Sequence, residues 1–309
     1  VLIYPSKISG EIDAPKSKSI AIRILFGSLI NDVILNEEIP KSNDVYAAYN
    51  SIINMGVIRE ENRLKKPYSI DLNKTFYCGG SATVARILST LVLSLGGNAI
   101  IDGDDTLRKR PFEGLVKLSK LTNSVVSGNS LPIKISSKGI NDYIEIPELE
   151  SSQYITGLIY GFAYKGYGII RIKNKIPSFS YVMLTIDLLN DLGCNVKYED
   201  NEIIVDKCIN KKYETSFPGD YLLSSFYAIS SLLTGGLTII NNLYKASNYF
   251  GDHKIVDILS EIGAKSKLIN GRWIIESNDL SNLRVNVDDS PDMAMSLAPL
   301  GIKVEVTLE

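Results

Sequence analysis

Histidine and cysteine are scarce in this chain, and their scarcity excludes several kinds of active site. His253 is the only histidine among 309 residues, so no His-based triad or histidine-containing metal cluster is expected. We interpret it as a surface or hydrogen-bonded helix residue. The three cysteines are odd in number and lack metal-ligand spacing, which is typical of a reducing compartment: Cys78, Cys194 and Cys208. We therefore expect a cytoplasmic protein without a metal, in which Cys78 is a buried structural thiol rather than a reactive one.

Long hydrophobic runs and a strong net charge are also missing. The most apolar stretch, Ile87 to Ile101, is interrupted by serine, threonine, glycine and asparagine, and is shorter than the ~20 residues of a membrane span. Lys7, Glu11 and Asp13 interrupt the N-terminal segment, so no signal peptide is expected. The net charge of −2 gives no overall attraction to nucleic acid or to an anionic membrane. The sequence also contains no P-loop or Rossmann fingerprint.

What the chain does contain is a segment type that recurs at intervals of roughly 60–75 residues. Each copy has an extended apolar stretch, a cluster of small polar residues and an apolar-periodic helix. The clusters are Pro15–Ser19, Gly79–Thr83, Ser151–Gln153, Gly219–Ser225 and Asp288–Asp292. Each lies at a helix start, where free backbone N–H groups and the helix dipole favour anions. Several such ends together predict a site for a multiply charged, phosphorylated ligand.

A second set of helices completes the repeated unit. They begin at Asp44, Ser180 and Asp252, and each is closed by a glycine that favours a helix end. The unit reads strand, helix, strand, strand, helix, strand, and its parallel strands need helical crossovers. We predict an α/β (α+β) fold of two domains with helices packed together and sheets facing outward. Residues 16–218 form the first domain of three repeats and 219–309 the second. The first strand fits either domain by its pattern.

Three cations stand close to the first polar cluster. Lys16, Lys18 and Arg23 surround Ser17 and Ser19 at a helix start, where the dipole disfavours positive charge. A bound anion would resolve that conflict. The alternative is a solvated basic turn, which is weakened because Arg23 lies among apolar helix residues.

The remaining clusters each have a functional and a structural interpretation. The glycines of Gly79–Thr83 allow close approach of a ligand or serve helix packing. The basic run Arg108–Arg110 binds an anion or forms a charged surface turn. Ser151 and Ser152 hold a phosphate or only cap a helix. Asp292 acts as a general base on a hydroxyl near captured phosphates, or lies in an acidic cluster in which Asp289 or Ser290 caps a helix.

Taken together and in this order, the motifs resemble those of the 5-enolpyruvylshikimate-3-phosphate (EPSP) synthase family over almost the whole chain. The matching segments are Pro15–Ser19 with Arg23, Gly79–Thr83 with Arg86, Arg108–Pro111, Ser151–Gln153, Ser178 with Tyr181, Gly219–Asp220 and Pro291–Asp292. Each motif alone is weak, whereas their order and spacing are specific.

The resemblance implies the family's two-domain enolpyruvyl-transferase fold, with residues 1–15 added to the second domain. It implies transfer of the enolpyruvyl group of phosphoenolpyruvate to the 5-hydroxyl of shikimate 3-phosphate, with release of phosphate and without a cofactor. We expect a monomer with no nucleic-acid or membrane partner. The residues implied at shikimate 3-phosphate are Lys18, Ser19, Arg23, Ser151, Ser152, Gln153, Ser178, Tyr181 and Asp292. Those implied at phosphoenolpyruvate are Lys18, Ala82, Arg110 and Gln153, and the implied catalytic residues are Lys18 and Asp292.

The chain departs from the family pattern in two respects. The family's K-E-T/S-D-R, D-H-R and C-terminal lysine motifs are absent, and Met293–Leu297 looks like the sequence that follows D-H-R. Our hypothesis is that several dozen residues are missing between Asp292 and Met293; the alternative is that Asp292 belongs to an altered D-H-R. Ala82 stands where most members have glycine, and its methyl group would crowd the phosphoenolpyruvate site. We therefore expect weak inhibition by glyphosate.

Two other functions are compatible with parts of the pattern. The sister transferases that act on UDP-N-acetylglucosamine carry a reactive cysteine in the loop matching Asp102–Pro111 and usually asparagine in place of Ser19, and this chain has neither. A non-catalytic phosphometabolite-binding protein would keep the polar clusters and lose the chemistry. Phosphate release in the presence of both substrates separates that binding protein from an enzyme.

Overall fold

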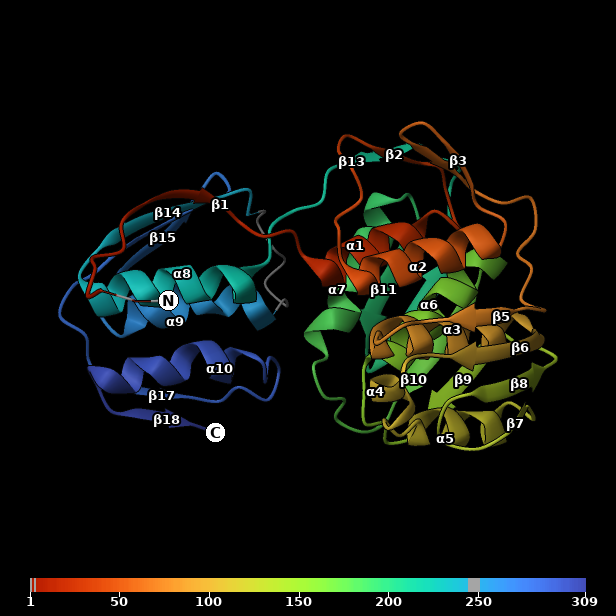
Figure 1. The fold of residues 1–309 in the computed structure, drawn as a ribbon. Helices are drawn as coiled ribbons and strands as arrows, with labels where there is room; N and C mark the ends of the chain where they lie inside the picture. The colour runs from red at the N-terminus through yellow and green to blue at the C-terminus, as the bar shows by residue number, and fades with distance from the viewer. Residues whose placement is uncertain (1, 3, 244–250) are drawn as a thin grey trace. The chain divides into compact units, whose positions relative to one another are not determined.

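The computed structural model describes residues 2, 4–243 and 251–309 and divides the chain into two compact units (Figure 1). The larger unit consists of Lys18–Phe217. The smaller unit consists of Val1–Ser17 together with Pro218–Glu309. Both units are built from the same arrangement of strands and helices.

The common element is a four-stranded sheet with helical crossovers, seen most simply in the middle of the larger unit. There the strand order is β5-β6-β8-β7, with β5 parallel to β6 and the other neighbours antiparallel. A helix joins the two parallel strands, and a second helix leads into the antiparallel hairpin. The order along the chain is therefore strand, helix, strand, helix, strand, strand, and the expected strand–helix–strand–strand–helix–strand order is wrong in the place of the second helix. The expected helical crossover between parallel neighbours is observed.

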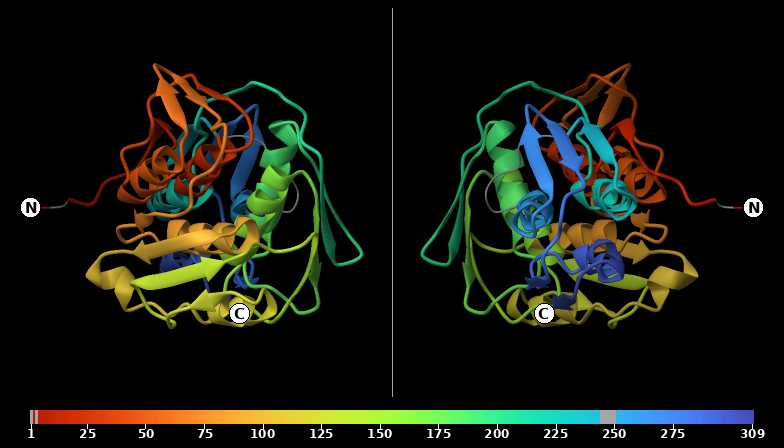
Figure 2. Two further views of the ribbon diagram at one scale, coloured as in Figure 1. Left: turned by 90° about the vertical axis from the view of Figure 1, so that its right-hand side faces the viewer. Right: turned by 90° about the vertical axis from the view of Figure 1, so that its left-hand side faces the viewer.

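The larger unit contains three such repeats. The first comprises α1 (Lys18–Gly27), β2 (Val33–Leu35), α2 (Asn43–Asn54), β3 (Ile58–Glu60) and β4 (Arg63–Lys65). The second comprises β5 (Thr75–Tyr77), α3 (Ala82–Leu95), β6 (Gly97–Asp102), the short α4 (Asp105–Arg108), α5 (Glu113–Leu121), β7 (Val125–Val126) and β8 (Ile133–Ser137). The third comprises β9 (Tyr143–Ile146), α6 (Gln153–Lys165), β10 (Gly168–Ile172), α7 (Ser180–Asp191), β11 (Asn195–Glu199) and β12 (Glu202–Asp206). The helices lie between the sheets, as the left view of Figure 2 shows, which confirms the expected placement of helices inside and sheets outside.

Two glycines of α6 let that helix lie directly against α3 in the core of the larger unit. A Cβ atom at Gly157 would overlap the backbone carbonyl of Ile87, and one at Gly161 would overlap the hydroxyl of Ser94. Close backbone approach of this kind requires residues without a side chain. The two helices that follow the Gly79–Thr83 and Ser151–Gln153 clusters are therefore fixed against each other.

The first strand of the chain and the strand before the fourth polar cluster are exchanged between repeats. β1 (Gly10–Asp13) precedes α1 but pairs in parallel with β14 (Leu237–Asn241) of the smaller unit. β13 (Tyr213–Thr215) precedes the smaller unit's first helix but pairs in parallel with β2 of the larger unit. Each strand takes the place that the repeat pattern assigns to the other, so the chain passes twice between the units.

The smaller unit has one complete four-stranded sheet, in the order β1-β14-β16-β15. Its other elements are α8 (Tyr221–Thr234), the 3₁₀ turn η1 (Gly251–Lys254), α9 (Ile255–Glu261), β15 (Lys265–Ile269) and β16 (Arg272–Glu276). A second, two-stranded sheet pairs β17 (Leu283–Val285) with β18 (Val306–Leu308), and α10 (Met293–Leu297) and the 3₁₀ turn η2 (Ala298–Ile302) lie between these strands in the chain. Trp273 is fully buried, and its indole N–H donates to the hydroxyl of Ser266 at 2.9 Å.

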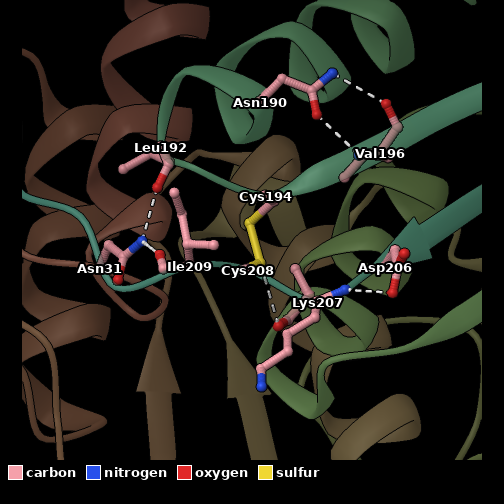
Figure 3. The surroundings of a disulfide bond; sticks show 10 residues. Asn31, Asn190, Leu192, Cys194, Val196, Asp206, Lys207, Cys208 and Ile209 are labelled. Carbon is pink, nitrogen blue, oxygen red and sulfur yellow. Dashed lines mark hydrogen bonds between the residues drawn. A yellow bond between two sulfur atoms is a disulfide. The ribbon is translucent and has the colours of Figure 1, made fainter.

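A disulfide joins Cys194 to Cys208 (Figure 3), so the expectation that all cysteines are reduced thiols is wrong. Cys194 directly precedes β11, and Cys208 lies just beyond the end of β12. The antiparallel register, which pairs Asn195 with Asp206, brings the two ends of this hairpin together. Because such a disulfide is typical of oxidising compartments or of hyperthermophiles, the cysteine content no longer argues for a reducing cytoplasm.

The same hairpin is attached to the first repeat by Asn31. The Asn31 amide donates to the carbonyl oxygens of Leu192 at 2.7 Å and Ile209 at 2.8 Å, one on each side of the disulfide (Figure 3). Cys78, in contrast, is a free and fully buried thiol, as expected. Burial raises the pKa of this thiol, which keeps it protonated and unreactive.

Two features are absent from the described part of the chain. No helix there is long and apolar enough to cross a membrane. Within the same residues, no group of three or more His, Cys, Asp or Glu side chains is placed to hold a metal ion.

Candidate active site

Lys18, the first residue of α1, is held by a carboxylate from the second helix. Its ammonium nitrogen lies 2.6 Å from Oδ2 of Asp44. Asp44 lies in the first turn of α2, where the helix dipole also favours a negative charge. The Lys18 side chain is half exposed, so an anion can reach it from solvent only in competition with Asp44. Asp44 was not among the predicted site residues because it lies in a different helix.

Arg23 is a buried cation that joins α1 to α7. It is 1% exposed, and among the described residues its guanidinium donates from Nε to Thr185 Oγ1 at 2.9 Å, from Nη1 to the Ser19 carbonyl at 2.9 Å, and from Nη2 to the Tyr181 carbonyl at 3.1 Å. The Arg23 Cζ atom also lies 5.4 Å from the centroid of the Tyr181 ring. Burying a charge is unfavourable unless its donors are satisfied, so these contacts hold the guanidinium in one orientation. Three predicted residues, Ser19, Arg23 and Tyr181, therefore lie together.

Thr185 connects this arrangement to α6. Its hydroxyl accepts from Arg23 and donates to the Tyr181 carbonyl at 2.9 Å, and it lies 3.3 Å from the hydroxyl of Thr156. Tyr160 donates its own hydroxyl to the carbonyl of Arg23 at 2.7 Å. Burial raises the pKa of Tyr160, so its hydroxyl stays a neutral donor. Three helices thus fix the position of one arginine.

Ser178 adopts a backbone conformation that is unusual for its residue type. Its φ is +53°, in the left-handed region, where a residue with a Cβ atom is strained. Its carbonyl accepts from the Tyr181 N–H at 3.2 Å in the turn that opens α7. Such strain is concentrated at functional sites, which agrees with the predicted role of Ser178 beside Tyr181.

The two serines before α6 do not both serve as helix caps. Ser152 occupies the N-cap position and is 3% exposed, yet its side chain makes no capping hydrogen bond. The Ser151 hydroxyl accepts from the Gln153 N–H at 3.3 Å. Capping therefore does not account for Ser152, whose hydroxyl stands at a helix start where an anion is favoured.

Gln153 is held at both ends of its amide by residues of α3. Its Oε1 accepts from Arg86 Nη1 at 3.0 Å, and its Nε2 donates to Thr83 Oγ1 at 2.9 Å. Both partners belong to the motif that consists of Gly79–Thr83 and Arg86. The close packing of α3 on α6 brings the second and third polar clusters together.

The start of α3 is shaped by its small residues. Ser81 caps the helix by accepting from the Val84 N–H at 3.4 Å. Gly79 has φ +54°, and a Cβ atom at Gly80 would lie 3.0 Å from Asp104 Oδ2. Ala82 is the first residue of α3 and is 6% exposed. The turn therefore favours glycine at its first position and leaves the methyl group of Ala82 packed at the helix start.

The basic run before α5 divides into a paired and an exposed part. Arg108 binds Asp102 with Nη2 2.8 Å from Oδ2 and Nε 3.0 Å from Oδ1. The hydrogen bond from Arg108 lowers the pKa of the Asp102 carboxyl. Arg110 is exposed in the loop between α4 and α5, and its side chain makes no ion pair among residues 4–243 and 251–309. Arg110 is therefore accessible to an external anion.

Asp292 lies in the smaller unit. It directly precedes α10, is exposed, and makes no capping hydrogen bond with its side chain. The neighbouring Ser290 hydroxyl donates to Asp252 instead. Helix capping by the Asp292 carboxylate is therefore not observed, which leaves the predicted role in proton transfer open.

The structure thus places predicted residues in two clusters of the larger unit. The α1–α7 cluster consists of Ser19, Arg23, Tyr181 and Thr185. The α3–α6 cluster consists of Thr83, Arg86, Phe112, Gln153 and Tyr154. Of the predicted polar residues in this unit, four make no side-chain bond to either cluster within the residues described: Lys18, Arg110, Ser152 and Ser178. The Ser151 hydroxyl contacts only the backbone N–H of Gln153. Sequence reasoning missed Thr185, whose only signal was its i+4 spacing from Tyr181, and Tyr154, whose hydrophobic setting resembled plain core.

Comparisons with family models, curated proteins and solved structures all identify EPSP synthases as similar to this chain. A family model described as EPSP synthase (3-phosphoshikimate 1-carboxyvinyltransferase) matches residues 3–308. The 3-phosphoshikimate 1-carboxyvinyltransferase of Sulfurisphaera tokodaii is 44% identical over 302 residues, which cover 97% of this chain and 73% of that protein. The protein of the same name from Saccharolobus islandicus is 42% identical over 312 residues, covering 100% of this chain and 75% of that protein. An EPSP synthase structure from Acinetobacter baumannii aligns with a TM-score of 0.68 at 20% identity, covering 96% of this chain and 71% of that chain.

The repeated fold is that of the two-domain enolpyruvyl transferases. More specifically, the chain belongs to the EPSP synthase family. The resemblance inferred from the sequence motifs is thereby confirmed.

The same comparison bears on the junction between Asp292 and Met293. The match to the Saccharolobus islandicus protein places all 309 residues within 312 positions, and 312 − 309 leaves 3 positions for gaps in this chain. An internal omission of several dozen residues would need as many unmatched positions. This relative therefore leaves no room for such an omission, and Asp292 and Met293 are direct neighbours at the start of α10.

Proposed function

We propose that this protein binds shikimate 3-phosphate and phosphoenolpyruvate through the residues described above and joins them. As a member of the EPSP synthase family it is an enolpyruvyl transferase of the shikimate pathway. The 5-hydroxyl of shikimate 3-phosphate attacks the central carbon of phosphoenolpyruvate, whose methylene carbon takes up a proton. Loss of phosphate and of a proton from the resulting methyl group then restores the double bond in the product.

Both substrates are anions, and the larger unit offers fixed cations to oppose their repulsion. Arg23 is pre-oriented by hydrogen bonds to Ser19, Tyr181 and Thr185, so it needs no reorganisation on binding. We assign Ser19 and Arg23 to the carboxylate of shikimate 3-phosphate, and Gln153 and Tyr181 to its ring. Holding both reactants in place removes much of the entropic barrier.

The phosphate of shikimate 3-phosphate is assigned to the serines at two helix starts. Ser151 and Ser152 precede α6, and Ser178 precedes α7, so the N–H groups and dipoles of two helices support the same anion. The uncapped hydroxyl of Ser152 and the strained backbone of Ser178 support this assignment. Arg110, Gln153 and Lys18 are assigned to phosphoenolpyruvate, beside Ala82.

The proton transfers are assigned to Asp292 and Lys18. The exposed Asp292 carboxylate acts as the general base on the attacking hydroxyl. Lys18 exchanges its partner Asp44 for the substrate anion and supplies positive charge during addition. We further propose that the protein works as a monomer in the cytoplasm, which sedimentation and fractionation would test.

The observation that carries the proposal is the buried Arg23, which brings Ser19, Tyr181 and Thr185 of two repeats together around one cation. Its test is phosphate release by the purified protein in the presence of both substrates. We expect release that requires shikimate 3-phosphate and phosphoenolpyruvate together, and none when UDP-N-acetylglucosamine replaces the shikimate substrate. Tight binding of shikimate 3-phosphate without phosphate release would instead support a non-catalytic binding protein.

A further inference from the structure

Arg86 lies at the centre of the α3–α6 cluster and contacts both segments that carry predicted phosphoenolpyruvate ligands. It hydrogen-bonds Gln153 Oε1 directly, at 3.0 Å. Its Cζ atom lies 5.5 Å from the ring centroid of Tyr154, the residue after Gln153, and 5.5 Å from that of Phe112, two residues after Arg110. One guanidinium therefore anchors the start of α6 and the loop before α5 to α3.

The hydrogen bonds around the Gln153 amide determine its orientation. Arg86 can only donate, so it selects the amide oxygen, while Thr83 accepts from the amide nitrogen. Without Arg86 the amide would be free to rotate by half a turn and exchange its donor and acceptor. The orientation of Gln153 toward a substrate thus depends on a residue that need not touch the substrate.

The Nε atom of Arg86 indicates that the hydrogen bond to Gln153 and the two aromatic rings determine where the guanidinium lies. It is buried and makes no hydrogen bond among the described residues, which is an uncommon and unfavourable state for an N–H donor. The aromatic rings of Phe112 and Tyr154 offset that loss, because a desolvated cation near an aromatic face is stabilised.

Tyr154 extends the same anchoring to α5. Its hydroxyl donates to Glu150 Oε1 at 2.9 Å, and the same oxygen accepts from the backbone N–H of Gly114 at 3.2 Å. Burial raises the pKa of Tyr154, which keeps the hydroxyl a donor. A Cβ atom at Gly114 would lie 2.6 Å from Tyr154 Cε2, so α5 starts directly against this ring.

We propose that Arg86 is a positioning residue: through its hydrogen bond to Gln153 and its contacts with Tyr154 and Phe112, it sets the orientation of the Gln153 amide and the place of the loop that carries Arg110. The proposal rests on the proposed function, which assigns Gln153 and Arg110 to the substrates. Arg86 itself need not touch a substrate, because it acts through Gln153 and through the loop that carries Arg110.

The sequence supplies a direct probe, because Gln153 is the only glutamine of the 309 residues. A protein labelled with ¹⁵N in the glutamine side-chain amide gives one pair of NMR signals. We expect the Arg86→Lys substitution, which keeps the charge but loses the planar fork, to move this pair toward the positions of free glutamine. The Arg59→Lys control, which alters an arginine 5.7 Å from the Tyr49 ring, should leave the pair unchanged. An unchanged pair in folded Arg86→Lys protein would overturn the proposal.

Steady-state kinetics then test whether Arg86 acts through Gln153. We expect Arg86→Lys to lower kcat/KM for phosphoenolpyruvate on the order of 10- to 100-fold, as small misplacements of catalytic groups do. In a Gln153→Ala background the same substitution should cost less than about threefold, because residues that act as a unit are not additive. Full additivity of the two substitutions would contradict the proposal.

The same signals separate this proposal from the proposed function. If Arg86→Lys moves the Gln153 pair but neither substrate does, Arg86 is confirmed as the residue that orients Gln153 and the substrate assignment fails. If Arg86→Lys does not fold, Phe112→Leu removes one ring and keeps the hydrogen bond. It should shift the pair by a smaller amount in the same direction, and no shift would overturn the proposal.

Discussion

The α1–α7 cluster and the α3–α6 cluster both hold an arginine, but by different means. Arg23 donates to two main-chain carbonyls and one hydroxyl, that of Thr185. Within the described part of the chain, Arg86 has one side-chain oxygen and two aromatic rings around it, and its Nε makes no hydrogen bond there. Main-chain acceptors are fixed by the helices themselves, whereas each contact of Arg86 depends on a particular side chain. The first cluster should therefore be the more rigid, and the second the more easily altered by single substitutions.

The largest effect should come from removing the charge of the α1–α7 cluster. Arg23→Met keeps most of the side-chain volume and removes the guanidinium that donates to the carbonyls of Ser19 and Tyr181. We expect kcat/KM for shikimate 3-phosphate to fall on the order of 1,000-fold, the loss seen when a preorganised electrostatic group is removed. Steady-state kinetics measure this, with Arg59→Met as a control at an exposed arginine of the same unit. A loss under tenfold would show that Arg23 is structural.

The next effect concerns the helix crossing that supports the α3–α6 cluster. Gly161→Ala would place a methyl group on Ser94, and we expect the free energy of unfolding to fall by about 2 kcal/mol. Denaturant unfolding monitored by circular dichroism measures it. Gly301→Ala is the matched control, since nothing lies within 4 Å of a Cβ atom there. Equal stability of the two variants would contradict close packing of α3 on α6.

A smaller effect should follow loss of the Thr185 hydroxyl that accepts from Arg23. Thr185→Val preserves shape but removes the hydroxyl oxygen that accepts from Arg23 Nε, which costs about 1–2 kcal/mol. We expect a roughly tenfold loss of affinity for shikimate 3-phosphate, measured by titration calorimetry. Thr238→Val provides a control, because the buried Thr238 hydroxyl makes no hydrogen bond within the described residues. Similar affinity in both variants would mean that the carbonyls alone orient Arg23.

The smallest effect is expected at Ala82, the first residue of α3. Removing its methyl group enlarges the site assigned to phosphoenolpyruvate, and one methyl group in a pocket is worth about 1–3 kcal/mol. Ala82→Gly should lower the glyphosate concentration for half inhibition by about fivefold or more. Inhibition curves of the two proteins at one phosphoenolpyruvate concentration measure this. Identical curves would refute the proposed crowding.

Several residues of the two clusters could be predicted from the sequence, because the polar segments at helix starts are local patterns. Arg23 stood out as a cation among apolar helix residues, and Gln153 followed two serines at a helix start. Their partners were less accessible. Thr185 lies far from Arg23 in the chain, and only the packing of α7 on α1 brings them together.

The disulfide and the strand exchange also could not be predicted from the sequence. Cys194 and Cys208 become neighbours only through the register of the β11–β12 hairpin. The pattern of the first strand fitted either domain, and only pairing of β1 with β14 assigns it to the smaller unit. Tertiary contacts of this kind leave no local signal in residue type or spacing.

The most direct test of the account is titration of the single Gln153 side-chain signal with shikimate 3-phosphate, in wild type and in Arg23→Met. The account predicts a saturable shift in the wild type and no shift at the same concentrations in Arg23→Met, because both clusters bind one ligand. A wild-type signal that does not respond to saturating shikimate 3-phosphate, or an equal response in Arg23→Met, would contradict it.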